Sequence, residues 1–152
     1  MTTRVKLSRT CFDSLVKHLV DIEEKKNSII DEYFPEPSKK RDELKKLFDT
    51  YIKQLEQLIN SANRSEEAGK NNYLPFVTIG SEVEVQNLDN QEIYKYRLVS
   101  PFNNDTENDD AVSYLSPVGR ALLLKKVNDV VAVKAPAGVF NYKIKSVRLC
   151  CL

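Results

Sequence analysis

Glycine-rich motifs, metal-ligand clusters and long apolar runs are all missing from this chain. Only four glycines and one histidine occur among its 152 residues, and no phosphate-binding loop, dinucleotide fingerprint or metalloprotease motif is present. His18 is not paired with a Ser or Cys nucleophile by any local signature, and we expect it to be a solvated helix residue. No stretch approaches the ~20 apolar residues that span a bilayer. These absences argue against a self-contained enzyme and against a membrane protein.

Cysteine is scarce, and the charges nearly cancel. The three cysteines, Cys11, Cys150 and Cys151, are odd in number and lack metal-ligand spacing. We expect reduced thiols and, because no signal-peptide pattern opens the sequence, a cytoplasmic protein. The acidic loop at residues 103–110 lacks the Gly and terminal Glu of a calcium loop, so no metal is expected there. The formal net charge of +1 gives no general attraction to nucleic acid, so a partner must be recognised locally.

Two helical repeats occupy the first part of the chain. Apolar residues recur every three or four positions over residues 12–33 and again over residues 44–62. Pro35 and Pro37 lie between the repeats and should end the first helix near residue 33. The pattern predicts an antiparallel helical hairpin, a coiled coil, over residues 1–66, with arms of roughly 22 to 24 residues and about 35 Å.

After a polar linker at residues 67–76, the pattern changes to strand-forming runs. Val, Ile, Phe and Tyr become frequent, and apolar and polar residues alternate. Ser116 and Pro117 begin the one helix expected here, because Ser caps free backbone N–H groups and Pro suits the first helical position. We therefore predict an α+β fold in which residues 77–152 form an antiparallel sheet of four or five strands with one packed helix. The expected strands include residues 83–85, 93–99, 130–133 and 139–147.

A motif in this second part resembles a known family. It reads Ser-Pro-Val-Gly-Arg-Ala-Leu at residues 116–122 and continues through Lys125 and Lys126 to Asp129. The motif resembles the C-terminal domain of the bacterial transcript-cleavage factors GreA and GreB, and residues 79–85 are similar to the first strand of that domain. The resemblance implies an FKBP-like sheet domain that docks on RNA polymerase at the rim of its secondary channel. It also implies that the hairpin enters the channel.

The resemblance further implies how such a factor acts. Acidic residues at the hairpin tip help to hold a Mg²⁺ ion in the polymerase's own active site, where water is activated to cleave backtracked RNA. The factor is then not an enzyme and binds no cofactor alone. In this sequence the tip candidates are Asp31, Glu32 and Glu36.

The tip departs from the family pattern. Nothing in residues 30–44 reproduces the family's acidic segment, and cations beside a carboxylate compete with a metal for it. The basic residues of this turn are Lys39, Lys40, Arg41, Lys45 and Lys46.

For docking on the polymerase, the resemblance points to Ser116, Pro117, Gly119 and Arg120. Helix capping by Ser116 and Pro117, and close helix-to-sheet packing at Gly119, are structural alternatives for the first three. Arg120 is the best candidate for a contact. Leu124 stands where the family commonly has Gly, which suggests altered local packing.

Three functional hypotheses remain open. The chain is an elongation factor whose tip promotes RNA cleavage, a non-cleaving polymerase-binding relative such as Rnk, or an interaction module or prolyl isomerase without polymerase binding. The third ranks last, because fold alone does not confer function and the sheet domain has no Trp. For either polymerase-binding hypothesis we expect a monomer that meets nucleic acid, DNA included, only within the elongation complex.

Overall fold

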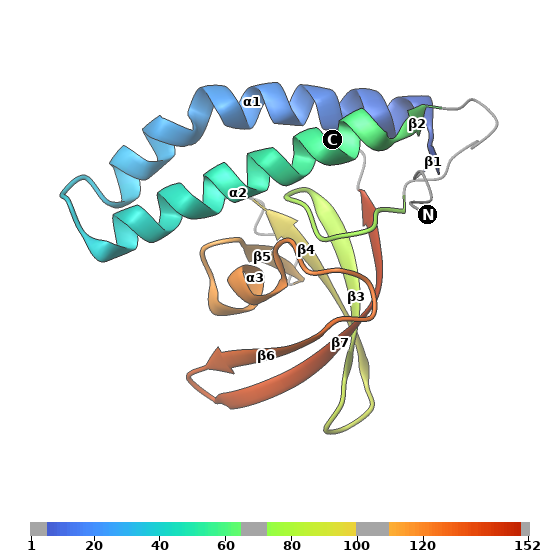
Figure 1. The fold of residues 1–152 in the computed structure, drawn as a ribbon. Helices are drawn as coiled ribbons and strands as arrows, with labels where there is room; N and C mark the ends of the chain where they lie inside the picture. The colour runs from blue at the N-terminus through green and yellow to red at the C-terminus, as the bar shows by residue number, and fades with distance from the viewer. Residues whose placement is uncertain (1–5, 65–72, 100–109, 150–152) are drawn as a thin grey trace. The chain divides into compact units, whose positions relative to one another are not determined.

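The structure, a computed structural model, describes residues 6–64, 73–99 and 110–149. The chain divides into two compact units, Met1–Asn71 and Asn72–Leu152. Within the described residues, the first unit contains two long helices, and the second contains a five-stranded sheet and a short helix (Figure 1). The predicted α+β class is confirmed. Cys150, Cys151 and most of the acidic loop lie outside the described residues.

Helices α1 (Arg9–Tyr33) and α2 (Lys39–Ser61) form the hairpin that the sequence predicts, and they lie side by side in Figure 1. Each begins at a serine cap: Ser8 Oγ accepts the N–H of Cys11, and Ser38 Oγ accepts that of Arg41, both at 3.1 Å. Neither helix, nor any other in the described part of the chain, is long and apolar enough to cross a membrane. The buried side chains include Leu15, Ile22 and Ile29 of α1 and Leu44, Phe48, Leu55 and Leu58 of α2.

His18 is not the solvated helix residue that the sequence suggested. Its Nε2 lies 2.7 Å from the hydroxyl oxygen of Tyr51 on α2, and the two rings meet edge to face with centroids 5.8 Å apart. Tyr51 is fully buried. Burial lowers the pKa of His18 from its ordinary value of 6.5, and the charge of Asp21 partly opposes that effect. The periodicity argument counted only apolar residues and so missed a polar member of the helix interface.

Lys26 interrupts the apolar seam of the first helix, and the structure gives it a partner on the second. Its Nζ lies 3.7 Å from Asp49 Oδ1, and both side chains remain partly exposed. Such a pair contributes little, roughly 0.2–1 kcal/mol. The interruption is therefore accommodated at the edge of the helix interface.

A pairing that the sequence did not predict closes the open end of the hairpin. Strands β1 (Lys6–Leu7) and β2 (Asn63–Arg64) run parallel, with Lys6 opposite Asn63 and Leu7 opposite Arg64. The Leu7 side chain is completely buried. The backbone before α1 is thereby tied to the backbone after α2.

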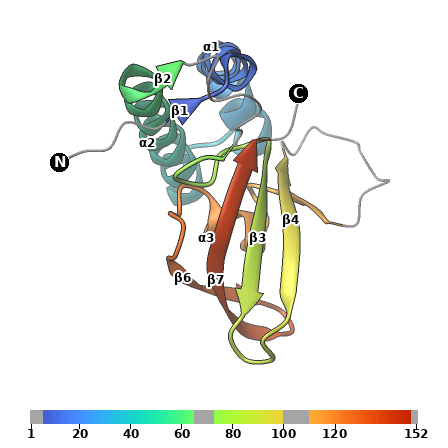
Figure 2. The same cartoon turned by 90° about the vertical axis from the view of Figure 1, so that its right-hand side faces the viewer.

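The second unit is built on a sheet with the strand order β5-β4-β3-β7-β6. In β3 the side chains alternate between buried and half-buried positions, and its antiparallel neighbours are β4 and β7 (Figure 2). The four strand regions named from the sequence are confirmed. The strands are β3 (Ser81–Asn87), β4 (Ile93–Val99), β5 (Ala111–Ser113), β6 (Val130–Ala135) and β7 (Gly138–Leu149).

One strand departs from the purely antiparallel sheet that the sequence predicted. β5 runs parallel to β4, with Leu98 opposite Val112, so the sheet is mixed. Three residues are too short for an alternating pattern to be recognised. Helix α3 (Pro117–Leu122) follows β5 and packs against β5 and β6, with Leu122 fully buried.

Residues 73–79 lead into the sheet and are packed with it. The backbone N–H of Leu74 donates to the carbonyl of Val147 at 2.9 Å, and the side chains of Leu74, Phe76 and Val77 are buried. The end of the segment expected as a linker, residues 67–76, therefore contributes to the core of the second unit.

Candidate functional site

The three predicted tip carboxylates lie at the end of the hairpin where α1 passes into α2. Asp31 and Glu32 are in the last turn of α1, Glu36 is in the connection that follows, and all three are exposed. In the described residues, no group of three or more His, Cys, Asp or Glu side chains is arranged to hold a metal ion. The tip therefore presents separate carboxylates.

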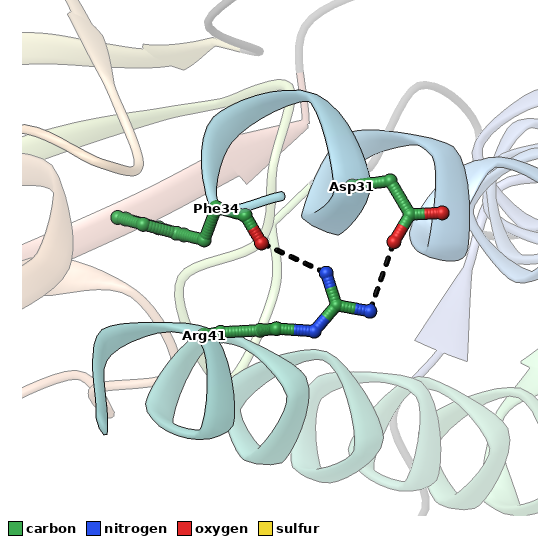
Figure 3. A network of polar contacts seen from close by, with 3 residues as sticks. All are labelled: Asp31, Phe34 and Arg41. Carbon is green, nitrogen blue, oxygen red and sulfur yellow. Dashed lines mark hydrogen bonds and ion pairs between the residues drawn. The ribbon is translucent and has the colours of Figure 1, made fainter. Parts of the chain in front are cut away.

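Arg41 contacts one of these carboxylates directly. Its Nη2 lies 2.9 Å from Asp31 Oδ1, and its Nη1 donates to the carbonyl oxygen of Phe34 at 2.8 Å (Figure 3). The Asp31 side chain is 66% exposed and that of Arg41 is 32% exposed. Arg41 was one of five basic residues named from the sequence, which could not show that this one bridges the two helices.

The predicted docking residues lie together on α3, and their local structure explains the first two. Ser116 Oγ accepts the N–H of Gly119 at 3.1 Å and donates its own hydroxyl to the carbonyl of Ser113 at 2.6 Å. Pro117 occupies the first helical position, where its missing N–H has no intrahelical partner to lose. The Ser-Pro pair therefore begins the helix as the sequence predicts.

Gly119 allows α3 to approach the sheet closely. The residue is buried, and a Cβ atom built there would overlap the carbonyl oxygen of Ser113 and lie 3.0 Å from Leu98 Cδ1. A side chain at this position would push the helix away from β4 and β5. The close-packing role considered for Gly119 from the sequence agrees with this geometry.

Arg120 is exposed and lines a surface pocket of about 380 Å³ beside β6. Lys125 and Asp129 line the same pocket, and Asp129 Oδ2 accepts the backbone N–H of Lys126 at 2.9 Å. Val130, at the pocket, is 58% exposed. The pocket thus combines two cations, one carboxylate and the side chains of Val130 and Val131, and its two cations could pair with an acidic side chain. Sequence reasoning quoted Lys125 and Asp129 in the motif but did not name them as site residues.

Leu124 follows α3 in a conformation that favours glycine. Its φ is +68°, in the left-handed region, while its N–H donates to the carbonyl of Val77 at 2.9 Å. This backbone turn is the physical reason that glycine suits the position.

Four aromatic side chains gather on one face of the sheet. Tyr94 and Tyr96 of β4 and Phe140 of β7 each contact the ring of Tyr142, with centroids 6.1 to 6.4 Å apart. The hydroxyls of Tyr96 and Tyr142 are 3.3 Å apart, and burial raises the pKa of Tyr96. These rings pack on one another around the buried Tyr142.

Comparison with known proteins gives a consistent set of relatives. The family model described as "Transcription elongation factor, GreA/GreB, C-term" matches residues 72–149. "Transcription elongation factor GreA" of Thermotoga sp. (strain RQ2) is 33% identical over 95% of this chain and 97% of its own length. The protein of the same name from Thermodesulfovibrio yellowstonii is 42% identical over 47% of this chain and 44% of its own. A solved GreA/GreB factor from Nitrosomonas europaea aligns over 95% of this chain and 99% of its own, at 22% identity and a TM-score of 0.49.

Proposed function

This chain belongs to the GreA/GreB family of transcription elongation factors, and on that premise we propose that it binds RNA polymerase and modulates elongation from the secondary channel. The observation that carries the proposal is the presence of both parts of such a factor in one chain. A hairpin of two long helices precedes a sheet unit that carries the Ser-Pro-Val-Gly-Arg motif on α3.

Docking is assigned in this proposal to α3 and the pocket beside it. Arg120 and Lys125 are exposed cations on one pocket, and a guanidinium binds a carboxylate through two parallel hydrogen bonds. Ser116, Pro117 and Gly119 serve the docking surface by fixing the helix that presents Arg120. The polymerase surface opposite should therefore be acidic.

The hairpin is the part proposed to enter the channel. Its helices contain 25 and 23 residues, a length of about 35 Å at 1.5 Å per residue. Glu32 and Glu36 are exposed at its end, and carboxylate oxygens are ligands that Mg²⁺ accepts. The catalytic Mg²⁺ and the active site belong to the polymerase, and the chain contributes only side chains to that site.

A second candidate function is favoured by the ion pair at the tip. Because Asp31 already has the guanidinium of Arg41 as its partner, one of the three carboxylates is engaged before any metal arrives. A factor that occupies the channel without promoting cleavage is consistent with this contact.

Two measurements test the proposal in sequence. Binding to core polymerase comes first, and the absence of a complex would refute both candidate functions. Transcript cleavage in a backtracked elongation complex then separates them, with Asp31→Ala, Glu32→Ala and Glu36→Ala combined in one variant. The matched control combines Glu23→Ala, Glu24→Ala and Glu56→Ala, which removes the same charge from exposed positions elsewhere on the hairpin.

Cleavage that the tip variant loses and the control keeps would establish a cleavage factor. Binding without cleavage by the wild-type protein would establish the channel-occupying factor. Cleavage that survives the tip variant would contradict the assignment of these three carboxylates.

A further inference from the structure

Arg41 makes two contacts that cross the turn between the helices. One nitrogen pairs with the Asp31 carboxylate at 2.9 Å, and the other donates to the main-chain carbonyl of Phe34 at 2.8 Å (Figure 3). Phe34 is the residue at which α1 is capped, and its own N–H donates to Ile30. A single side chain on the first turn of α2 therefore satisfies both an acceptor of the main chain and a charge on α1.

The electrostatics at the end of α1 favour this arrangement. The carboxyl end of a helix carries partial negative charge, so acidic residues there destabilise the helix and cations there stabilise it. Asp31 and Glu32 both lie in the last turn of α1, which contains no basic residue of its own. Arg41 supplies the missing positive charge from the other helix. The planar guanidinium suits two acceptors at once, whereas the ammonium of Lys does not reproduce that fork.

We propose that the guanidinium of Arg41 competes with divalent cations for the carboxylate of Asp31. Arg41 is therefore a positioning residue of the hairpin tip, which acts through Asp31 and does not bind the metal itself. Oδ1 of Asp31 must leave the guanidinium before it can coordinate a metal, whereas among the described residues Glu36 has no such ion-pair partner to exchange. The consequence for the polymerase's Mg²⁺ rests on the proposed function. The competition between Arg41 and a cation for Asp31 is a property of this chain alone.

The competition is testable on the isolated full chain with Mn²⁺ as the probe. Paramagnetic broadening of the backbone amide signals of residues 29–34 and 36 is measured by NMR during a Mn²⁺ titration of wild-type protein and the Arg41→Gln variant. We expect the variant to reach half-maximal broadening at about two- to five-fold lower Mn²⁺, the factor expected for losing a partly exposed ion pair. The control is Lys45→Gln, which removes one positive charge from an exposed position on the same helix.

Two further variants keep the test decisive. Adding Asp31→Asn to Arg41→Gln should return half-maximal broadening to the Mn²⁺ concentration of the wild-type protein, because the carboxylate that Arg41→Gln releases is then absent. Arg41→Lys, which keeps the charge but not the fork, should broaden at lower Mn²⁺ than the wild-type protein. The proposal is overturned if Arg41→Gln responds like Lys45→Gln, or if the gain survives Asp31→Asn.

A separate arm connects the result to the polymerase. If the chain promotes cleavage, Arg41→Gln should increase the cleavage rate at limiting Mg²⁺, and Asp31→Asn should cancel the increase. If the chain fails to bind polymerase, the proposed function is refuted, and the Mn²⁺ titration still decides the role of Arg41.

Discussion

The contact between His18 and Tyr51 should contribute measurably to the stability of the hairpin. Tyr51→Phe removes the hydroxyl that lies 2.7 Å from His18 Nε2 and leaves a half-buried imidazole without this hydrogen-bond partner. Losing one partner of such a bond costs about 1–2 kcal/mol. For a unit of this size, that corresponds to a fall in melting temperature of roughly 4–16 °C.

Far-ultraviolet circular dichroism is the appropriate assay for this change. Helices α1 and α2 contain 25 and 23 residues, whereas α3 contains 6, so the helical signal reports on the hairpin. Tyr94→Phe in the sheet unit is the matched control, because its hydroxyl contacts the exposed side chain of Glu92. The control should leave the helical transition unchanged.

A double variant gives the sharpest test of the reasoning. Replacing both hydrogen-bond partners by apolar groups can be nearly neutral, so Tyr51→Phe combined with His18→Leu should recover most of the lost stability. Melting of Tyr51→Phe within about 1 °C of the wild-type protein would refute the assigned contribution. An equal loss of stability in Tyr51→Phe and in the double variant would show that the substitution disturbed packing and not the hydrogen bond.

Three further predictions concern pH, capping and docking. Because the folded-state pKa of His18 lies below 6.5, the unfolded chain gains its proton first, so the free energy of unfolding should decrease as pH falls below that value and level off below the folded pKa. Thermal melts between about pH 8 and 5 should show this decrease in stability, and the His18→Leu variant should lack the share of the decrease that comes from His18. Ser116→Ala should destabilise the sheet unit by about 1 kcal/mol in urea titrations followed by tyrosine fluorescence, through loss of the cap on Gly119. Arg120→Ala should weaken polymerase binding about tenfold with an unchanged dichroism spectrum, and unchanged affinity would remove Arg120 from the interface.

The end of α1, the start of α3 and the main strands were predictable because each has a local cause. Serine caps begin all three helices among the described residues, and Pro35 follows the end of α1. Strand β3 shows its buried face directly as alternation in the sequence. These signals depend only on neighbours along the chain, so periodicity and capping rules can detect them.

The missed features depend on residues that are far apart in the sequence. Strands β1 and β2 have two residues each, and their pairing joins positions 6–7 to 63–64. The direction of β5, parallel to β4, is not indicated by its three residues alone. The hydrogen bond between His18 and Tyr51 spans 33 positions.

The sequence named candidate site residues, but it could not show which contacts their side chains make. Asp31, Glu32 and Glu36 were named as equivalent carboxylates, and only the three-dimensional contact separates Asp31 from the other two. Similarly, Lys125 and Asp129 belong to the sequence motif, but only the structure shows that they line the same pocket as Arg120. Charge composition alone contains no information about such pairings.

The two helices of the hairpin are joined by polar contacts at both of its ends, and this affects how the hairpin responds to force. The parallel pairing of Lys6–Leu7 with Asn63–Arg64 holds one end, and Arg41 holds the other. If one helix slid along the other by a single turn, about 5.4 Å, it would have to break both fastenings together. The two helices should therefore resist sliding past one another and bend together as one rigid element. A force applied at the tip would then reach the other end of the hairpin without the helices changing register.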